Sequence, residues 1–330
     1  MSMNSLIAAF PNNITQALEI ASNVKITPST KEIKNILICG MGGSGIGGKL
    51  VAKWVEDELK VPVAFTNDYN IPGFVSENTL VIGSSYSGNT EETLSSVSAA
   101  VERGARLIGI CSGGKMLELC EAGGFDAIVV PGGNPPRTAL AFSIVQLLKI
   151  FSELNLSSAD RLTEIEKGRQ LIVSNESEIK ERATELATFL KGNVGVFYGT
   201  TDYEPVLVRA RQQFNENGKM LNWHHTLPEM NHNELVGWGG GDERFATVFF
   251  QTDDIHRRNK KRLDITREAI SKKTSKIHTV LAKGESRIER SLYFINIVDW
   301  ASLYLAEMKQ VDPIDIEIID YLKDSLSNFK

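Results

Sequence analysis

The sequence is poor in cysteine, has no long hydrophobic run and carries no large excess of either charge. Only three of its 330 residues are cysteine, namely Cys39, Cys111 and Cys120. Three cysteines cannot all pair and no C-x-x-C spacing occurs, so a disulfide scaffold is excluded and a reducing compartment is expected. The 36 basic and 41 acidic residues give a net charge of −5. This balance provides no general attraction to nucleic acid or to anionic membranes.

The apolar segments are too short and too interrupted for a transmembrane helix. The richest, at 139–151, contains Ser143, Gln146 and Lys149, whereas a membrane span needs about 20 apolar residues. The N-terminus has neither the basic region nor the apolar core of a signal peptide. With 42% hydrophobic and 23% charged residues, the composition is typical of a globular protein. We therefore expect a cytoplasmic protein of about two domains.

Short apolar segments alternate with helical patterns along the first half of the chain. Such alternation is typical of a parallel sheet covered by helices on both faces. The strands are predicted at 35–39, 61–66, 79–82, 107–111 and 126–130, and the helices at 14–22, 49–59, 91–103, 116–121 and 139–154.

The second half repeats this plan after a charged, glycine-poor helical stretch. Strands are predicted at 193–198, 245–251 and 277–281, and helices at 204–216, 255–271, 286–308 and 315–325. The sequence therefore predicts an α/β protein with an N-terminal domain at 1–155, a helical connector at 156–190 and a C-terminal domain at 191–330.

A glycine-rich segment follows the first predicted strand and opens a helix. Glycines let the backbone approach a ligand closely, and the amide groups at a helix start favour an anion. Gly40, Gly42 and Gly45 also match the dinucleotide pattern G-x-G-x-x-G, and Asp68 lies near the end of the second strand, where that pattern needs an acidic residue. A nicotinamide or flavin site is therefore one alternative, and a turn that only packs strand against helix is another.

A hydroxyl-rich segment follows the third predicted strand. Five of the seven residues at 84–90, with sequence S-S-Y-S-G-N-T, carry a hydroxyl group. Hydroxyls and helix N-terminal amides together suit a phosphate monoester. A simple helix cap is the structural alternative, but a cap needs only one such residue, and a dinucleotide fold has no use for this segment.

The order of motifs resembles a known enzyme family. The segment S-Y-S-G-N-T-E-E-T is similar to the phosphosugar-binding loop of sugar isomerase (SIS) domains. Together with G-M-G-G-S-G-I-G-G, N-P-P-R, F-N-E-N and L-P-E-M-N-H-N-E, in order from Gly40 to about Lys323, it resembles the bifunctional phosphoglucose/phosphomannose isomerases of the phosphoglucose isomerase superfamily. The resemblance implies two SIS-type α/β/α sandwich subdomains, with phosphate-binding loops in the first. It also implies a site between the subdomains and a homodimer whose subunits complete each other's sites.

The resemblance implies an aldose–ketose isomerase that converts glucose 6-phosphate, mannose 6-phosphate or both to fructose 6-phosphate. Such a reaction opens the sugar ring and moves a proton between C1 and C2 through an enediolate, which needs a base, positive charge and a ring-opening acid. No metal or redox cofactor is required. The implied catalytic residues are Glu216 for proton transfer, His232 for ring opening, Arg137 beside the enediolate oxygen, and Lys323.

The same resemblance assigns the substrate-binding residues. They combine the glycine segment, the hydroxyl segment and the residue after Arg137, and they are Gly43, Ser44, Ser85, Ser87, Thr90 and Thr138. A hydroxyl at Thr138 would leave room at sugar C2, where glucose and mannose differ. The chain departs from the family pattern at Ile316, seven residues before Lys323, where the family has a threonine.

Other interpretations stay open at this point. A phosphosugar-binding SIS module without catalysis would keep the phosphate loop, although Glu216, Arg137 and His232 in their expected contexts favour an enzyme. A dinucleotide-dependent oxidoreductase is the third possibility. A metal site at His224 and His225 is disfavoured because adjacent side chains in a strand point to opposite faces.

Overall fold

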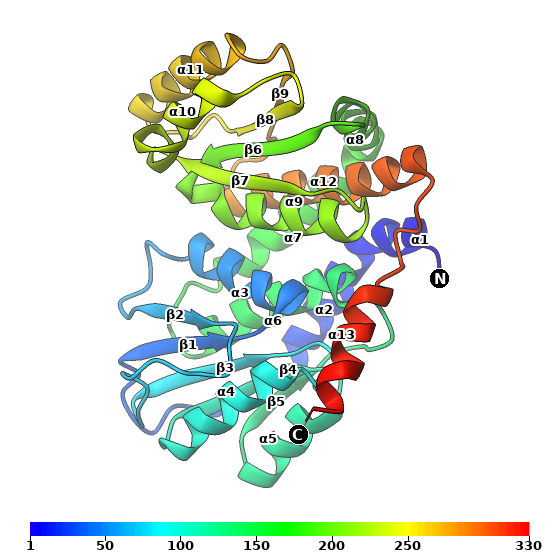
Figure 1. Ribbon diagram of the computed structural model, residues 1–330. Helices are drawn as coiled ribbons and strands as arrows, with labels where there is room; N and C mark the ends of the chain where they lie inside the picture. The colour runs from blue at the N-terminus through cyan, green and yellow to red at the C-terminus, as the bar shows by residue number, and fades with distance from the viewer. Residues whose placement is uncertain (330) are drawn as a thin grey trace. The chain divides into compact units, whose positions relative to one another are not determined.

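The computed structural model describes residues 1–329, which fall into two compact units. The N-terminal unit comprises 8–174 and 283–292, and the C-terminal unit comprises 1–7, 175–282 and the chain from 293 onward. Each unit contains one parallel sheet flanked by helices (Figure 1). The α/β class with two helix-covered parallel sheets is therefore confirmed, while the domain boundaries expected from the sequence stay predictions.

The sheet of the N-terminal unit has five parallel strands in the order β2-β1-β3-β4-β5. Its inner strands β1, β3 and β4 are almost wholly buried, and Cys39 at the end of β1 pairs with Gly83 near the end of β3. The chain runs from β1 to the edge and then crosses back to β3, so a topological switch point lies between these two strands. The strands are β1 (Asn35–Cys39), β2 (Val63–Thr66), β3 (Thr79–Ser84), β4 (Arg106–Cys111) and β5 (Asp126–Val129).

Helices cover both faces of this sheet, α4 and α5 on one face and α3 and α6 on the other (Figure 1). Cys39, Cys111 and Cys120 are free thiols buried in the core beneath α4 and α5. Helix α6 is buried on most sides, which explains the long apolar run of its sequence. The helices are α2 (Phe10–Asn23), α3 (Gly42–Trp54), α4 (Glu91–Glu102), α5 (Gly114–Gly123), α6 (Leu140–Glu153) and α7 (Asp160–Ser174).

The C-terminal unit has four parallel strands in the order β7-β6-β8-β9. Alternate residues of β6 face two different cores: Tyr198 packs on Phe249, with α11 on that side, and Phe197 packs on Phe214 of α9. The strands are β6 (Val194–Thr200), β7 (Asn222–Leu227), β8 (Phe245–Gln251) and β9 (Ile277–Leu281). The remaining helices of the chain are α1 (Met3–Ala8), α8 (Glu176–Leu190), α9 (Glu204–Glu216), α10 (Glu234–Gly237), α11 (Arg257–Ser271), α12 (Arg287–Lys309) and α13 (Glu317–Ser327).

Two local structures differ from the sequence expectations. Helix α3 begins at Gly42 rather than near Lys49, although glycine is a poor helix former. Packing requires these glycines, because a Cβ at Gly47 would lie 2.3 Å from the Ser143 Oγ and one at Gly48 would lie 2.7 Å from Ile38 Cγ2. Strand β7 was not predicted, since its sequence N-W-H-H-T-L is polar and forms a half-buried sheet edge.

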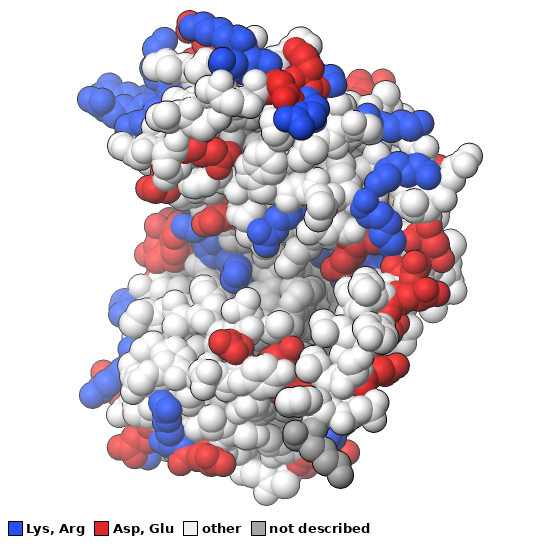
Figure 2. All heavy atoms as spheres, in the orientation of Figure 1, with Lys and Arg blue, Asp and Glu red and all other residues white. Residues whose placement is uncertain are grey.

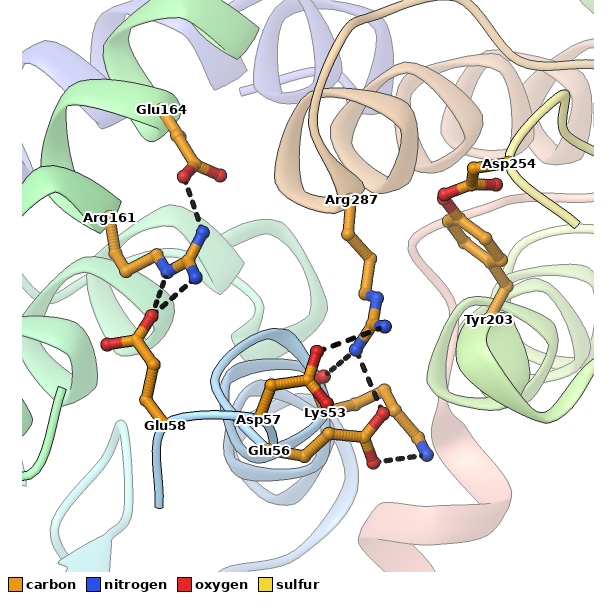
Figure 3. A network of polar contacts seen from close by, with 9 residues as sticks. All are labelled: Lys53, Glu56, Asp57, Glu58, Arg161, Glu164, Tyr203, Asp254 and Arg287. Carbon is orange, nitrogen blue, oxygen red and sulfur yellow. Dashed lines mark hydrogen bonds and ion pairs between the residues drawn. The ribbon is translucent and has the colours of Figure 1, made fainter. Parts of the chain in front are cut away.

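A polar network anchors the end of α3 that lies away from the glycine segment (Figure 3). Arg287 donates to the Lys53 carbonyl at 2.7 Å and to Glu56 Oε1 at 2.9 Å. A cationic donor at the last carbonyls of a helix satisfies groups that lack an intrahelical partner. Arg161 similarly joins Glu58 to Glu164. These contacts fix the orientation of α3, and hence of the segment at its N-terminus.

Charge is unevenly distributed over the surface. Lys and Arg side chains gather where α11 lies (Figure 2), and this helix exposes Arg257, Arg258, Lys260 and Lys261 within its first two turns. Across residues 1–329, no helix combines the length and the apolar character that crossing a bilayer requires.

Candidate active site

The glycine segment lies at the carboxyl end of β1 and touches the segment after β3. A Cβ at Gly40 would lie 2.8 Å from the Ser84 carbonyl oxygen, and one at Gly45 would lie 2.5 Å from the Gly40 carbonyl oxygen. Real Cβ atoms do not approach so closely, so both positions require glycine. The N-terminus of α3 is thereby held against the end of β3, at the switch point where ligands of open α/β sheets bind.

Ser44 joins the two segments through hydrogen bonds. Its Oγ accepts from the Tyr86 amide at 3.0 Å, and its carbonyl accepts from Ser84 Oγ at 3.3 Å. The side chain is 8% exposed. The sequence did not predict this hydrogen bond from Tyr86, because a backbone amide is present at nearly every residue and no motif identifies it.

The hydroxyl segment is folded tightly by its own side chains. Ser85 Oγ and Thr90 Oγ1 lie 2.9 Å apart, and Ser87 Oγ accepts from the Asn89 amide at 3.2 Å. Gly88 adopts a positive φ of +72°, and a Cβ there would lie 1.7 Å from the Gly113 carbonyl oxygen. Ser85 is buried, Thr90 is half-buried and Ser87 is exposed. The segment therefore has a defined shape and offers at least one hydroxyl to solvent.

Thr90 occupies the N-cap position of α4, but its side chain makes no capping hydrogen bond. Its hydroxyl instead contacts Ser85. The cap alternative therefore does not account for the hydroxyls. The N-terminus of α4 opens directly from this segment, so its amide dipoles favour an anion at the same place.

Arg137 and Thr138 lie in a short 3₁₀ helix, η1 (Pro136–Thr138), immediately before α6. Arg137 therefore does not start α6, which begins at Leu140. A Cβ at Gly43 would lie 2.8 Å from the Pro136 carbonyl oxygen and 3.1 Å from the Arg137 amide. The absence of a side chain at Gly43 thus brings η1 against the first turn of α3.

The environment of Arg137 differs from that of an exposed arginine at the start of a helix. Arg137 is only 3% exposed, and Thr138 donates its hydroxyl to the Pro135 carbonyl at 2.8 Å. A buried guanidinium interacts strongly with nearby charges, because its surroundings have a low dielectric constant. The N-terminal unit therefore gathers all of its sequence-predicted site residues around the ends of β1 and β3. They are Gly43, Ser44, Ser85, Ser87, Thr90, Arg137 and Thr138.

Glu216 is the last residue of α9 and is half-buried. Arg209 and Gln213 of α9 and Asn217, the residue after its end, are three polar residues at a spacing of four, which is one face of a helix. Arg209 and Gln213 donate to Asp299 of α12, and Asn217 donates to Ser302 at 3.0 Å. The sequence could have predicted this polar face from the spacing of these three residues at i, i+4 and i+8.

Asp299 lies at the centre of this contact and is 4% exposed. Burial raises the pKa of its carboxyl group, while the charge of Arg209 acts in the opposite direction. The Arg209 guanidinium contacts both carboxylate oxygens, at 2.9 and 3.0 Å. A buried charge is tolerated only when it is paired and hydrogen-bonded. This pair fixes α9 against α12 close to Glu216.

Lys219 connects the end of α9 to the segment that precedes α13. Its Nζ donates to the Glu216 carbonyl at 2.5 Å and to the Asp315 carbonyl at 2.8 Å. Lys323 lies on α13, as expected, but its exposed side chain contacts Asp320 at 3.8 Å. Ile316 is the N-cap of α13 and provides no capping hydrogen bond. Glu216 and the start of α13 are thus close neighbours.

His232 lies at the other end of the C-terminal sheet from Glu216. It ends a 3₁₀ helix, η3 (Glu229–His232), that directly follows the carboxyl end of β7, and it is exposed. The end of α9 adjoins the amino end of the same strand, where Asn215 accepts from Asn222 at 2.9 Å. The length of β7 separates these ends by roughly 20 Å at 3.3 Å per residue. His232 thus lies at the junction of two short helical turns, η3 and α10 (Glu234–Gly237).

The side chains of the two adjacent histidines diverge. His224 and His225 are consecutive residues of β7 and point to opposite faces, with His225 Nδ1 accepting from the Thr226 amide at 2.8 Å. Within residues 1–329, no three His, Cys, Asp or Glu side chains are grouped closely enough to hold a metal ion. Asp68 lies two residues beyond β2 and accepts from the Tyr69 amide at 2.7 Å.

Comparison with known proteins identifies both units. Residues 31–117 match the SIS domain, and residues 179–326 match the bacterial phospho-glucose isomerase C-terminal SIS domain. A bifunctional phosphoglucose/phosphomannose isomerase of Caldicellulosiruptor bescii is 37% identical over 97% of each chain. One from Aquifex aeolicus is 36% identical over 89% of this chain and 90% of its own. In fold, the chain is similar to the C-terminal domain of glucosamine-fructose-6-phosphate aminotransferase from Francisella tularensis, with a TM-score of 0.77, 16% identity, and coverage of 94% and 96%.

Proposed function

We propose a reaction for this chain, which belongs to the family of bifunctional phosphoglucose/phosphomannose isomerases. It interconverts glucose 6-phosphate, mannose 6-phosphate or both with fructose 6-phosphate. It is an isomerase, and the resemblance inferred from its motifs is confirmed. The proposal concerns which substrates it takes and which residues act on them.

The observation that carries the proposal is the meeting of two anion-binding helix starts at the ends of β1 and β3. The glycine segment and the hydroxyl segment touch through Gly40 and Ser44, and buried Arg137 lies against the first turn of α3. Hydroxyls, amide dipoles and positive charge suit a phosphorylated sugar. A tight hold on the remote phosphate would orient the reacting carbons.

Each predicted catalytic residue then receives a role. Glu216 moves the proton between C1 and C2, and the Arg137 guanidinium stabilises the negative charge that develops on the enediolate oxygen. Ser44, Ser85, Ser87 and Thr90, with Gly43, hold the phosphate and sugar. Thr138 lies beside sugar C2, next to Arg137.

We further propose that the enzyme is a homodimer in which a second subunit supplies His232. Glu216 and His232 lie at opposite ends of one sheet, and the length of β7 separates them. A single hexose cannot contact both residues of one C-terminal unit across that distance. Lys323 belongs with Glu216, because Lys219 links the end of α9 to the start of α13. A second copy that donates His232 completes the set.

The location in the cell is proposed to be the cytoplasm. The three thiols are free and buried, which suits a reducing compartment. The domain division at 1–155, 156–190 and 191–330 is likewise kept as a proposal, with the SIS match at 31–117 and the second match at 179–326 as its support.

The role of Glu216 is tested by Glu216→Gln. General acid–base catalysis contributes about 10²- to 10⁴-fold, so turnover of glucose 6-phosphate should fall by at least that factor, while substrate affinity measured by calorimetry is retained. Glu181→Gln, an equal charge change at an exposed position of α8, is the matched control and should leave turnover unchanged. Retained turnover in Glu216→Gln would contradict the assignment.

A further inference from the structure

A hollow in the C-terminal unit includes no residue of the proposed catalytic set. Its volume is about 390 Å³, within the usual range of small-molecule sites. Three aromatic side chains and one carboxylate line it, together with glycines at and after the end of α10. The lining residues are Trp223, Glu234, Gly237, Trp238, Gly240, Gly241 and Phe245.

The polar groups of the hollow converge on Glu234. Its Oε1 accepts from Trp223 Nε1 at 3.0 Å and from the Tyr198 hydroxyl. Trp238 Nε1 donates to that same hydroxyl at 2.9 Å. Both indole N–H groups are therefore engaged, and the tryptophans present carbon surface to the hollow. Burial, followed by the contact with Glu234, raises the pKa of Tyr198, so its phenol stays a neutral donor.

The second oxygen of Glu234 has a different environment. In the described part of the chain, no donor or cation contacts Oε2. This oxygen is not buried, so a ligand can reach it. Glu234 forms no ion pair among residues 1–329. The lining side chains therefore offer a ligand one carboxylate oxygen and aromatic carbon, but no unengaged N–H or O–H donor.

The charges at the rim do not neutralise Glu234. Arg244 lies 5.8 Å from the Phe245 ring centre, but Asp242 pairs with it at 2.8 Å. Lys273 donates to the Gly239 carbonyl at 3.2 Å and is exposed. A carboxylate among aromatic rings attracts a cation and repels a phosphate, because the ring quadrupole and the carboxylate act in the same direction.

We propose that this hollow binds a small organic cation that carries an ammonium group, with Glu234 as the counter-charge and Trp223, Trp238 and Phe245 as the aromatic wall. The charge of the site excludes a hexose phosphate as its natural occupant. The hollow shares no residue with the proposed catalytic set, and Glu234 lies two residues after His232.

A charge-matched pair of probes tests this proposal on the full-length protein. Choline carries a trimethylammonium group, and 3,3-dimethylbutan-1-ol has the same shape without the charge. Calorimetry and tryptophan fluorescence should show saturable binding of choline, with the neutral analogue at least roughly tenfold weaker. Equal binding of the two probes, no binding of choline, or tighter binding of uncharged glucose would overturn the proposal.

Two variants locate the binding. Glu234→Gln preserves the side-chain size and should weaken choline at least roughly tenfold, whereas Glu268→Gln, an equal charge change on exposed α11, should not. If Glu234→Gln does not fold, Trp223→Leu removes part of the wall from the half-exposed edge strand and should also weaken choline. Unchanged choline affinity in a folded Glu234→Gln or Trp223→Leu protein would refute the site.

Discussion

Arg209 of α9 and Asp299 of α12 form a buried ion pair 2.9 Å long, and Arg209 lies about two helical turns before the half-buried Glu216. Both side chains are almost wholly inaccessible to solvent. Gln213 shares the same carboxylate at 2.8 Å. The polar face of α9 thus acts as a fixed contact that orients the end of the helix, where the proposed catalytic carboxylate lies.

Removing one partner of this pair should strongly destabilise the protein. Asp299→Leu leaves the Arg209 charge buried, and the loss of one buried partner typically costs about 3–5 kcal/mol. The double variant Arg209→Met with Asp299→Leu removes both charges and should recover most of that loss. Urea unfolding measures the change. Asp320→Asn, which removes an exposed pair with Lys323 at 3.8 Å, should leave the midpoint unchanged. A double variant no more stable than Asp299→Leu would contradict this explanation.

The contact between α3 and η1 predicts a sharp effect of one methyl group. A Cβ at Gly43 would lie 2.8 Å from the Pro136 carbonyl oxygen, so Gly43→Ala must displace η1 together with Arg137. Small displacements of catalytic groups can cost about 10²-fold in rate, and kcat/KM should fall at least roughly tenfold. Gly73→Ala, whose Cβ would meet no atom within 4 Å, is the control. Equal activity of the two variants would contradict the packing argument.

Thr138 is expected to influence the choice between the two aldoses. Its hydroxyl is committed to the Pro135 carbonyl at 2.8 Å, so its contribution at sugar C2 is mainly one of space. Thr138→Leu should therefore lower kcat/KM for mannose 6-phosphate more than for glucose 6-phosphate, while Thr138→Ser should affect the two equally. Equal losses in Thr138→Leu would remove the specificity role.

The buried thiols should be unreactive in the folded protein. Burial raises the pKa of Cys39 to about 12 and that of Cys120 to about 11, and only the thiolate reacts. Ellman's reagent at pH 8 should label no thiol until urea exposes all three. Because the folded pKa values exceed the unfolded value of 9.0, the unfolded state loses these protons first. The free energy of unfolding should thus decrease as the pH rises from about 9 to 12. Rapid labelling of native protein would contradict the burial.

The sequence predicted the parallel sheets well, because buried strands such as 35–39 and 245–251 are short apolar runs between turn signals. It also predicted α9 at its observed bounds. The polar edge strand β7 carries no such signal and was missed. That strand determines the separation of Glu216 from His232, so the sequence suggested the proposed second subunit only through the family resemblance.

Within the candidate site, local motifs predicted which residues gather at the ends of β1 and β3. They could not predict how these residues are held. The burial of Arg137 depends on the missing Cβ of Gly43, which lies 94 residues earlier in the chain. The position of Glu216 depends on Asp299. Both are tertiary contacts between distant segments, which helix propensity and hydrophobic periodicity do not predict.

The most direct measurement of the central claim is product formation by the purified wild-type protein. Glucose 6-phosphate and mannose 6-phosphate would be supplied separately, without added metal or nicotinamide in the isomerase step, and fructose 6-phosphate would be followed by a coupled assay. The proposed function predicts fructose 6-phosphate from one or both substrates, and product from both establishes dual specificity. Tight binding of both sugars with no product from either would contradict the isomerase and favour a phosphosugar sensor.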